Sequence, residues 1–82
     1  MLHIVTSIEG FSVCKRHVLP ADRVLFLGDG VYAMAPTECE QSYALLQDIK
    51  ARRVSRHSDV KCIDYDEFVD LVISASSSVT WK

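Results

Sequence analysis

The stretch 23–33, RVLFLGDGVYA, decides the fold of this chain. Its residues 24–27 form an unbroken apolar run with β-branched and aromatic members, which is typical of a strand covered on both faces of a parallel sheet. Two glycines then admit backbone angles closed to other residues, so a tight turn follows. The segment 31–35 predicts a short helix that ends before Pro36. This is the first half of a βαβ unit, and its turn lies at the carboxyl edge of the sheet, where open α/β sheets place their sites.

Length and composition limit what the chain can be. Its 82 residues make one domain, 1–82. A domain of this size buries only about 60–65% of the surface that its unfolded chain exposes. Because a parallel sheet also needs cover on both faces, we expect association with other subunits. A hydrophobic content of 49% with 24% charged residues excludes disorder, and the net charge of −2 gives no general attraction to nucleic acid.

The chain carries neither a membrane-spanning run of ~20 apolar residues nor a basic and apolar leader, so we expect a cytoplasmic protein with no membrane contact. The three cysteines, Cys14, Cys39 and Cys62, form no CxxC pair, which favours a reducing compartment over a disulfide scaffold. His3, His17 and His57 have no spacing that suggests a shared metal. We therefore predict neither a metal nor another cofactor.

Strands and helices are expected to alternate along the chain. The segment 67–73 is the clearest helix, because its residues Phe68, Leu71 and Val72 share one side and Asp64 or Asp66 caps it. Segment 74–82 is serine-rich and is expected to be a flexible tail. The alternation predicts a four-stranded parallel sheet in the order 2-1-3-4, with helices on both faces. The other strands are expected at 2–6, 42–46 and 60–65, and the other helices at 11–19 and 49–54.

Four landmarks occur in a fixed order along the chain: MLH at 1–3, DGVYA at 29–33, YALLQDIKAR at 43–52 and IDYDEFVDL at 63–71, with a tryptophan near the end. In this respect the sequence resembles the DsrH/TusB family of small sulfur-relay subunits, over nearly its whole length. Arg53 departs from the pattern, because family members usually have glycine there.

The resemblance implies a DsrE-like (flavodoxin-like) three-layer sandwich. It also implies a heterohexamer with TusC/DsrF-like and TusD/DsrE-like subunits, which takes persulfide sulfur from a TusA-like donor and passes it to a TusE/DsrC-like acceptor. The sulfur ends in 2-thiouridine at the tRNA wobble position or serves sulfur oxidation, and the sequence leaves this choice open. Because the sulfur-carrying cysteine of such complexes belongs to the TusD/DsrE-type subunit, the resemblance implies mainly a scaffold and interface role here.

Cys14 is the candidate for an accessory thiol. It precedes Asp29 by the spacing at which some DsrH-type members also carry a cysteine, and Lys15, Arg16 and His17 could lower its pKa. The alternative is that Cys14 is a small apolar residue on the buried side of a helix, which we favour. An independent sulfurtransferase that uses Cys14 is therefore kept as a second hypothesis.

Two further sets of residues are candidates for binding. Asp29 and Gly30 could shape a polar pocket at the carboxyl edge, although turn chemistry alone explains them and no phosphate-binding pattern is present. The basic segment 50–61 contains Arg52, Arg53 and Arg56, and a solvated helix and loop is the commoner explanation of such a segment. Among functional interpretations it favours docking of a partner protein over direct contact with tRNA, because no aromatic residues interleave. Tyr32 and Trp81 are expected as interface anchors, the latter on an outward-reaching tail, with closure of its own domain's edge as the alternative. Without its partners the chain could form a homo-oligomer.

Overall fold

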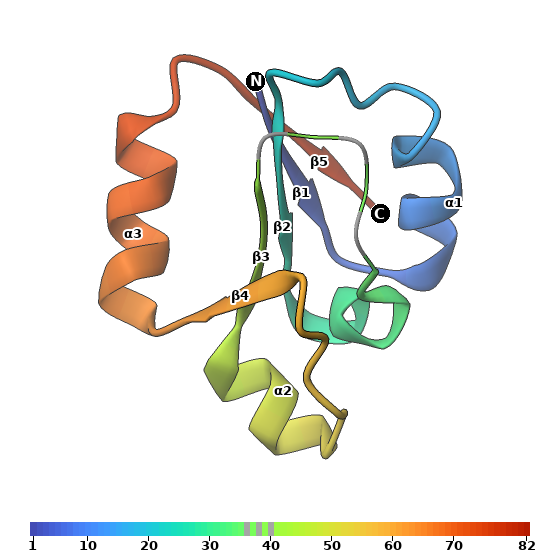
Figure 1. Cartoon of the computed structure of the whole chain (residues 1–82), viewed down its shortest axis with the longest axis vertical. Helices are drawn as coiled ribbons and strands as arrows, with labels where there is room; N and C mark the ends of the chain where they lie inside the picture. The colour runs from blue at the N-terminus through green and yellow to red at the C-terminus, as the bar shows by residue number, and fades with distance from the viewer. Residues whose placement is uncertain (36, 38, 40) are drawn as a thin grey trace.

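The structure, a computed structural model, describes residues 1–35, 37, 39 and 41–82. It is a three-layer α/β sandwich in which a parallel sheet has helices on both faces, as expected (Figure 1). The connection expected at 36–41 includes Pro36, Glu38 and Glu40, which lie outside the described residues. The elements in chain order are β1 (Leu2–Val5), α1 (Ile8–Cys14), β2 (Arg23–Phe26), the 3-10 helix η1 (Gly28–Ala33), β3 (Gln41–Leu45), α2 (Leu46–Arg52), β4 (Val60–Ile63), α3 (Tyr65–Ser74) and β5 (Ser78–Trp81).

The sheet has five strands in the order β4-β3-β2-β1-β5, and all four pairings among the described strands are parallel. The expected order 2-1-3-4 was wrong, because β2 lies between β1 and β3. The first three crossovers each move one strand in the same direction, and the reversal comes only with the fourth. That last crossover carries the chain over α3 from one edge of the sheet to the other.

The expected flexible tail is also corrected, since residues 78–81 form the fifth strand. β5 pairs in parallel with β1, with Val5 opposite Trp81. The Trp81 carbonyl accepts hydrogen bonds from the Thr6 amide and the Thr6 hydroxyl, both at 3.1 Å. Gly10 allows this close approach, because a Cβ there would lie 2.5 Å from the same carbonyl oxygen. The edge strand is thus tied to both β1 and α1.

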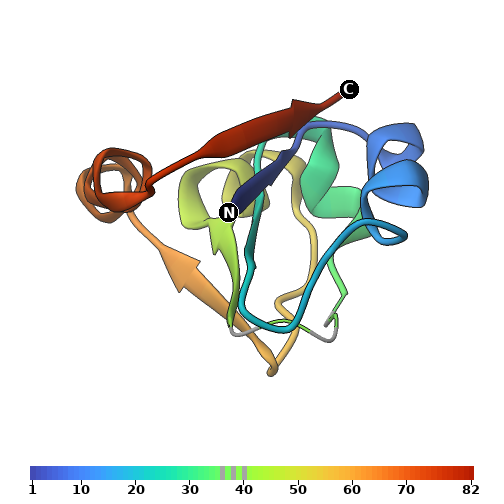
Figure 2. The ribbon, with the colours of Figure 1, turned by 90° about the horizontal axis from the view of Figure 1, so that it is seen from above.

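The two faces of the sheet are covered unequally. One, which we name the α1 face, buries residues such as Val24, Phe26 and Ala44 beneath α1, η1 and Ile49 of α2. The other, which we name the α3 face, buries Leu2, Leu25 and Ile63, and α3 is the helix that covers them in the part of the chain that the structure describes. Figure 2 shows α3 set apart on its side of the sheet, away from α1 and η1.

The helix ends follow local capping chemistry. Ser7 caps α1, because its hydroxyl accepts from the Gly10 amide at 2.9 Å, so the helix starts earlier than the expected Phe11. Asp64 caps α3 as one of the two expected candidates, and Glu67 completes a capping box. α2 begins at Leu46 without a side-chain cap, so the expected start at Ile49 was wrong. Among the described residues, no helix has the length and apolar character needed to cross a membrane.

Candidate functional site

The turn after β2 lies at the carboxyl edge, where the sequence placed a pocket. Gly28 has a positive φ of 51°, which favours glycine. Gly30 lies so close to the end of β1 that a Cβ would overlap the Val5 carbonyl oxygen. The segment 28–33 therefore folds as a 3-10 helix held against β1, and this local packing explains the two glycines.

Asp29 and Arg52, two predicted site residues, meet at this edge. The Arg52 Nε donates to Asp29 Oδ1 at 3.0 Å, and its Nη1 lies 3.5 Å from Asp48 Oδ1. Asp48 also accepts from the Gly28 amide at 2.8 Å, so it links α2 to η1 rather than capping α2. The hydrogen bond with Asp29 raises the pKa of the Arg52 guanidinium. The Arg52 side chain thus occupies the place where the sequence suggested a polar pocket.

Cys14 lies in the core under the α1 face, away from that edge. It is fully buried, and burial raises the pKa of its thiol to about 11, with smaller contributions from Cys39 and Asp22. The neighbouring Lys15 and Arg16 are exposed. A thiol with a raised pKa stays protonated at neutral pH, whereas a reactive thiol is a thiolate. The geometry therefore favours the packing interpretation of Cys14.

The amino edge of the sheet holds a polar network that the sequence analysis missed. His3 and Asp22 are both buried, and the His3 Nε2 lies 2.9 Å from Asp22 Oδ2. The Trp81 Nε1, which only donates, lies 3.1 Å from His3 Nδ1. His3 Nδ1 must accept this bond, so Nε2 carries the proton and donates to Asp22. A histidine at the centre of a buried strand was the available signal, because a buried imidazole needs partners.

Asp22 collects further donors. Its carboxylate also accepts from the Leu19 amide at 2.9 Å and from the Met1 amino group at 3.1 Å. The His3 hydrogen bond, with help from these donors, lowers the pKa of Asp22 from 3.8 to about 2. Trp81 stacks on His3 and on His17, with ring centroids 6.1 and 5.3 Å apart. Its indole therefore closes the edge of its own domain, the alternative considered for it.

The remaining predicted interface residues lie on the surface. Tyr32 projects from η1 with more than half of its area exposed. Arg53 ends α2 in the left-handed conformation with φ 53°, which explains why glycine suits this position. Arg56 follows in the exposed loop. The structure brings Arg52 to Asp29 but places Tyr32 and Trp81 on separate elements.

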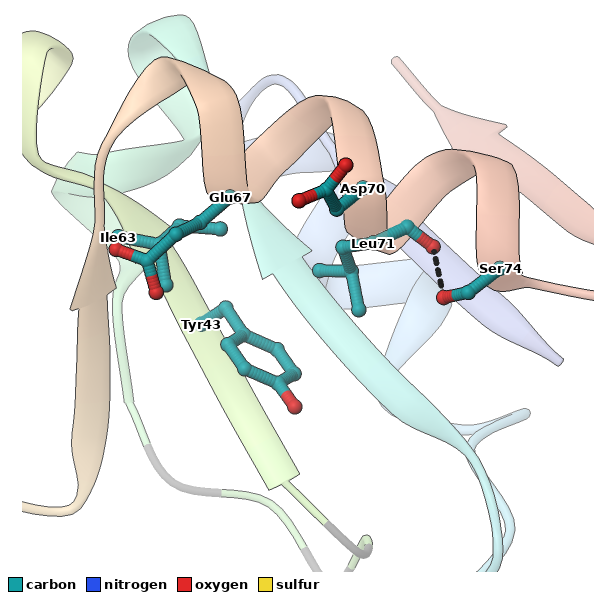
Figure 3. Close-up of a pocket in the computed structure, with 6 residues that line it drawn as sticks. All are labelled: Tyr43, Ile63, Glu67, Asp70, Leu71 and Ser74. Atoms are coloured by element: carbon teal, nitrogen blue, oxygen red, sulfur yellow. Dashed lines mark hydrogen bonds between the residues drawn. The ribbon is translucent and has the colours of Figure 1, made fainter.

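Two cavities lie beside α3, and sequence reasoning found neither. The larger, of about 340 Å³, opens between α3 and strands β3 and β4, at Tyr43 and Ile63. Figure 3 shows the Tyr43 ring beneath the helix that carries Glu67 and Asp70. The second, of about 250 Å³, lies at the carboxyl edge between α2 and the start of α3 and includes Lys50 and Asp64. Within residues 1–35, 37, 39 and 41–82, no cluster of three or more His, Cys, Asp or Glu side chains is arranged to hold a metal.

Comparison with known proteins decides the family. A family model described as DsrH like protein matches residues 6–78. The chain belongs to the DsrH/TusB family. It is 34% identical to Protein TusB of Photorhabdus laumondii over an alignment of 82 positions, which covers 87% of this chain and 86% of the relative. It is 31% identical to Protein TusB of Escherichia coli strain SMS-3-5 over an alignment of 91 positions, which covers 98% of this chain and 96% of the relative. The matched residues 6–78 begin directly after β1 and end at the first residue of β5.

Proposed function

We propose that this chain is a scaffold and interface subunit of a sulfur-relay complex that serves 2-thiolation of the tRNA wobble uridine. Membership of the DsrH/TusB family and similarity to two proteins named TusB support this proposal. The partners would be TusC/DsrF-like and TusD/DsrE-like subunits, with a TusA-like donor and a TusE/DsrC-like acceptor. The complex would work in the cytoplasm.

The observation that carries the scaffold role is the state of Cys14. A relay cysteine must meet the cysteine of another protein, but Cys14 is fully buried and its thiol pKa is raised to about 11. Surface residues that could contact partners are available instead. They are Tyr32 on η1 and the exposed Arg53 and Arg56 beyond α2.

The test is co-expression of this chain with the C-type and D-type subunits from the same genome. We expect a stable complex on size exclusion, and we expect the chain to restore 2-thiouridine in the tRNA of a strain that lacks its own B-type subunit. The Cys14→Ala variant should still form the complex and restore 2-thiouridine, because alanine also fills a buried apolar position. A chain that never copurifies with either subunit would exclude the proposal, and thiolation lost only in Cys14→Ala would exclude the scaffold role.

The alternatives are a DsrH-type subunit in sulfur oxidation, or a sulfurtransferase in its own right that uses Cys14. For sulfur transfer to Cys14, its thiolate attacks the sulfane sulfur of a donor cysteine persulfide. Cys14 becomes the persulfide, and the donor cysteine leaves as a thiolate. Incubation with a persulfidated TusA-like donor, followed by intact mass, tests it. A gain of one sulfur atom that is lost in Cys14→Ser would support this alternative.

A further inference from the structure

Helix α3 has more apolar surface than its own sheet uses. At about 100° per residue, the apolar side chains from Leu71 around to Ile73 span an arc of about 200°. A helix that packs against one sheet needs an apolar face of only about 100°. Phe68, Leu71 and Val72 contact the core of the α3 face and account for one half of this arc.

The other half of the arc is a stripe of three residues, Tyr65, Val69 and Ile73, which we name the α3 stripe. They are spaced four apart, so they lie one above another on the helix. Tyr65 is 59% exposed and Ile73 is 75% exposed, and Val69 between them is half-buried. Ile73 therefore presents apolar area to whatever lies outside the chain, and the exposed Tyr65 also lines the second cavity beside Lys50 of α2.

The α3 stripe lies on the flank of the helix opposite the larger cavity. The opposite flank carries Glu67, Asp70 and Ser74, which line the larger cavity together with Tyr43 of β3 and Ile63 of β4 (Figure 3). The Ile73 end of the stripe, from which the chain continues into β5, therefore adjoins the part of the α3 face formed by β1 and β5. There Ile4 is only half-buried and Thr80 is exposed.

The width of the sheet shows what shape would cover this region. Five strands spaced about 4.8 Å apart span roughly 19 Å, whereas one packed helix covers about 10 Å. On the α3 face this chain supplies one helix, while α1, η1 and α2 share the other face. The uncovered width accommodates one additional helix beside α3.

Charge decides which helix fits. The segment 64–74 carries Asp64, Asp66, Glu67 and Asp70 and contains no lysine or arginine. On the outer side of the helix, Asp66 is next to the α3 stripe, and Asp70 lies between Asp66 and the larger cavity, which it also lines. A second copy that packed α3 against α3 would place these carboxylates near one another, and the repulsion would oppose assembly. A helix with lysine or arginine beside its apolar residues would instead pair with them.

We infer that the α3 stripe is the docking surface for an amphipathic helix of a different subunit, whose apolar stripe is flanked by basic residues and which completes the cover of the α3 face. The inference deepens the proposed function and rests on it, because the sister subunits of the relay complex are the candidates for this occupant.

The test compares two single lysine substitutions at exposed apolar residues, in binding of the purified chain to the C-type and D-type subunits. Ile73→Lys places a charge on the α3 stripe, and Ile8→Lys is the matched control on α1, where the side chain is 53% exposed. Because both side chains reach water, both variants should fold as the wild type does, which circular dichroism confirms. We expect Ile73→Lys to weaken binding about tenfold or more and Ile8→Lys to change it less than about twofold.

The charge is tested separately with Asp66→Lys and Asp70→Lys. We expect each to weaken binding to the sister subunit, with the loss shrinking at high salt, whereas Asp59→Lys in the loop before β4 should leave binding unchanged. If both α3 variants bind as the wild type does, the claim that the docking helix carries basic residues beside its apolar stripe is wrong.

The remaining outcomes separate this inference from the proposed function. If wild-type chain binds neither subunit, the proposed function fails and the inference with it. If wild-type chain binds but Ile73→Lys binds equally well, or both lysine variants lose binding equally, the inference alone fails. Self-association of the wild-type chain in sedimentation, abolished by Ile73→Lys, would identify a second copy as the occupant and overturn the inference.

Discussion

Two polar networks of this chain lie at opposite edges of the sheet and differ in burial. At the amino edge, the side chains of His3 and Asp22 are 2% and 8% exposed. At the carboxyl edge, those of Arg52 and Asp29 are 27% and 70% exposed. Each network joins segments that are about 20 residues apart, with donor to acceptor distances near 3 Å. Similar hydrogen-bond geometry therefore does not mean a similar contribution to the free energy of unfolding.

Burial makes the difference because water competes at only one edge. A buried carboxylate that loses its donors keeps the cost of its own desolvation, whereas an exposed one is solvated again. The amino-edge network should therefore fix the position of β5 through His3 and Trp81. The carboxyl-edge network should orient η1 relative to α2 and contribute little to global stability.

Removal of the Asp22 side chain should have the largest effect. Asp22→Ala leaves the His3 Nε2 proton and the Leu19 amide without their acceptor at a buried site. We expect a loss of about 3 kcal/mol in the free energy of unfolding, measured by urea denaturation. Asp22→Asn keeps an oxygen acceptor and should lose less. A loss below about 1 kcal/mol for Asp22→Ala would show that the buried network contributes no more to stability than an exposed one.

The pH dependence of stability should show the same carboxylate. The pKa of Asp22 is about 2 in the folded chain and 3.8 ordinarily, so its contribution is fully present above pH 4 and is lost as the pH falls toward 2. The two values correspond to about 2 kcal/mol. We expect the difference in unfolding free energy between wild type and Asp22→Asn to shrink across this window. A difference that stayed constant from pH 5 to pH 2 would contradict the lowered pKa.

Replacement of Trp81 by phenylalanine should have a smaller effect. Trp81→Phe preserves an aromatic ring between His3 and His17 but removes the Nε1 donor to His3 Nδ1. We expect a loss of about 1 kcal/mol in the free energy of unfolding, and faster amide hydrogen exchange in β5. Trp81→Ala should lose more, because the ring itself contacts the core of the α1 face. Equal losses in the two variants would mean that the hydrogen bond alone positions the strand.

The fold was largely predictable because its strongest signals are local. The apolar run 24–27 and the cap at Asp64 both act within a few residues, and the structure confirms the buried strand and the capped helix. β5 was not predictable in this way. Its four residues form a strand only because β1, more than 70 residues earlier, supplies the hydrogen-bond partners. The strand order failed for the same reason, since it depends on crossovers between distant segments.

The candidate site was less predictable than the fold, because side-chain pairing is set in three dimensions. Asp29 was correctly placed at the carboxyl edge, but its partner Arg52 lies 23 positions away. Cys14 has three basic neighbours in sequence, yet its buried position raises the pKa of the thiol. The decisive variable in both cases is which atoms surround the group, and sequence neighbours do not determine it.

Removal of the Arg52 side chain should have the smallest effect and so completes the comparison of the two edges. Arg52→Ala frees Asp29, which returns to water, and leaves Asp48 with the Gly28 amide. In urea denaturation the loss should be roughly a quarter or less of that in Asp22→Ala, and it should fall further in high salt. Arg56→Ala, in the exposed loop, is the matched control for removal of one positive charge. If Arg52→Ala destabilised the chain as much as Asp22→Ala, the exposed carboxyl-edge network would contribute as much to stability as the buried amino-edge network. Burial would then not explain a difference between the two edges.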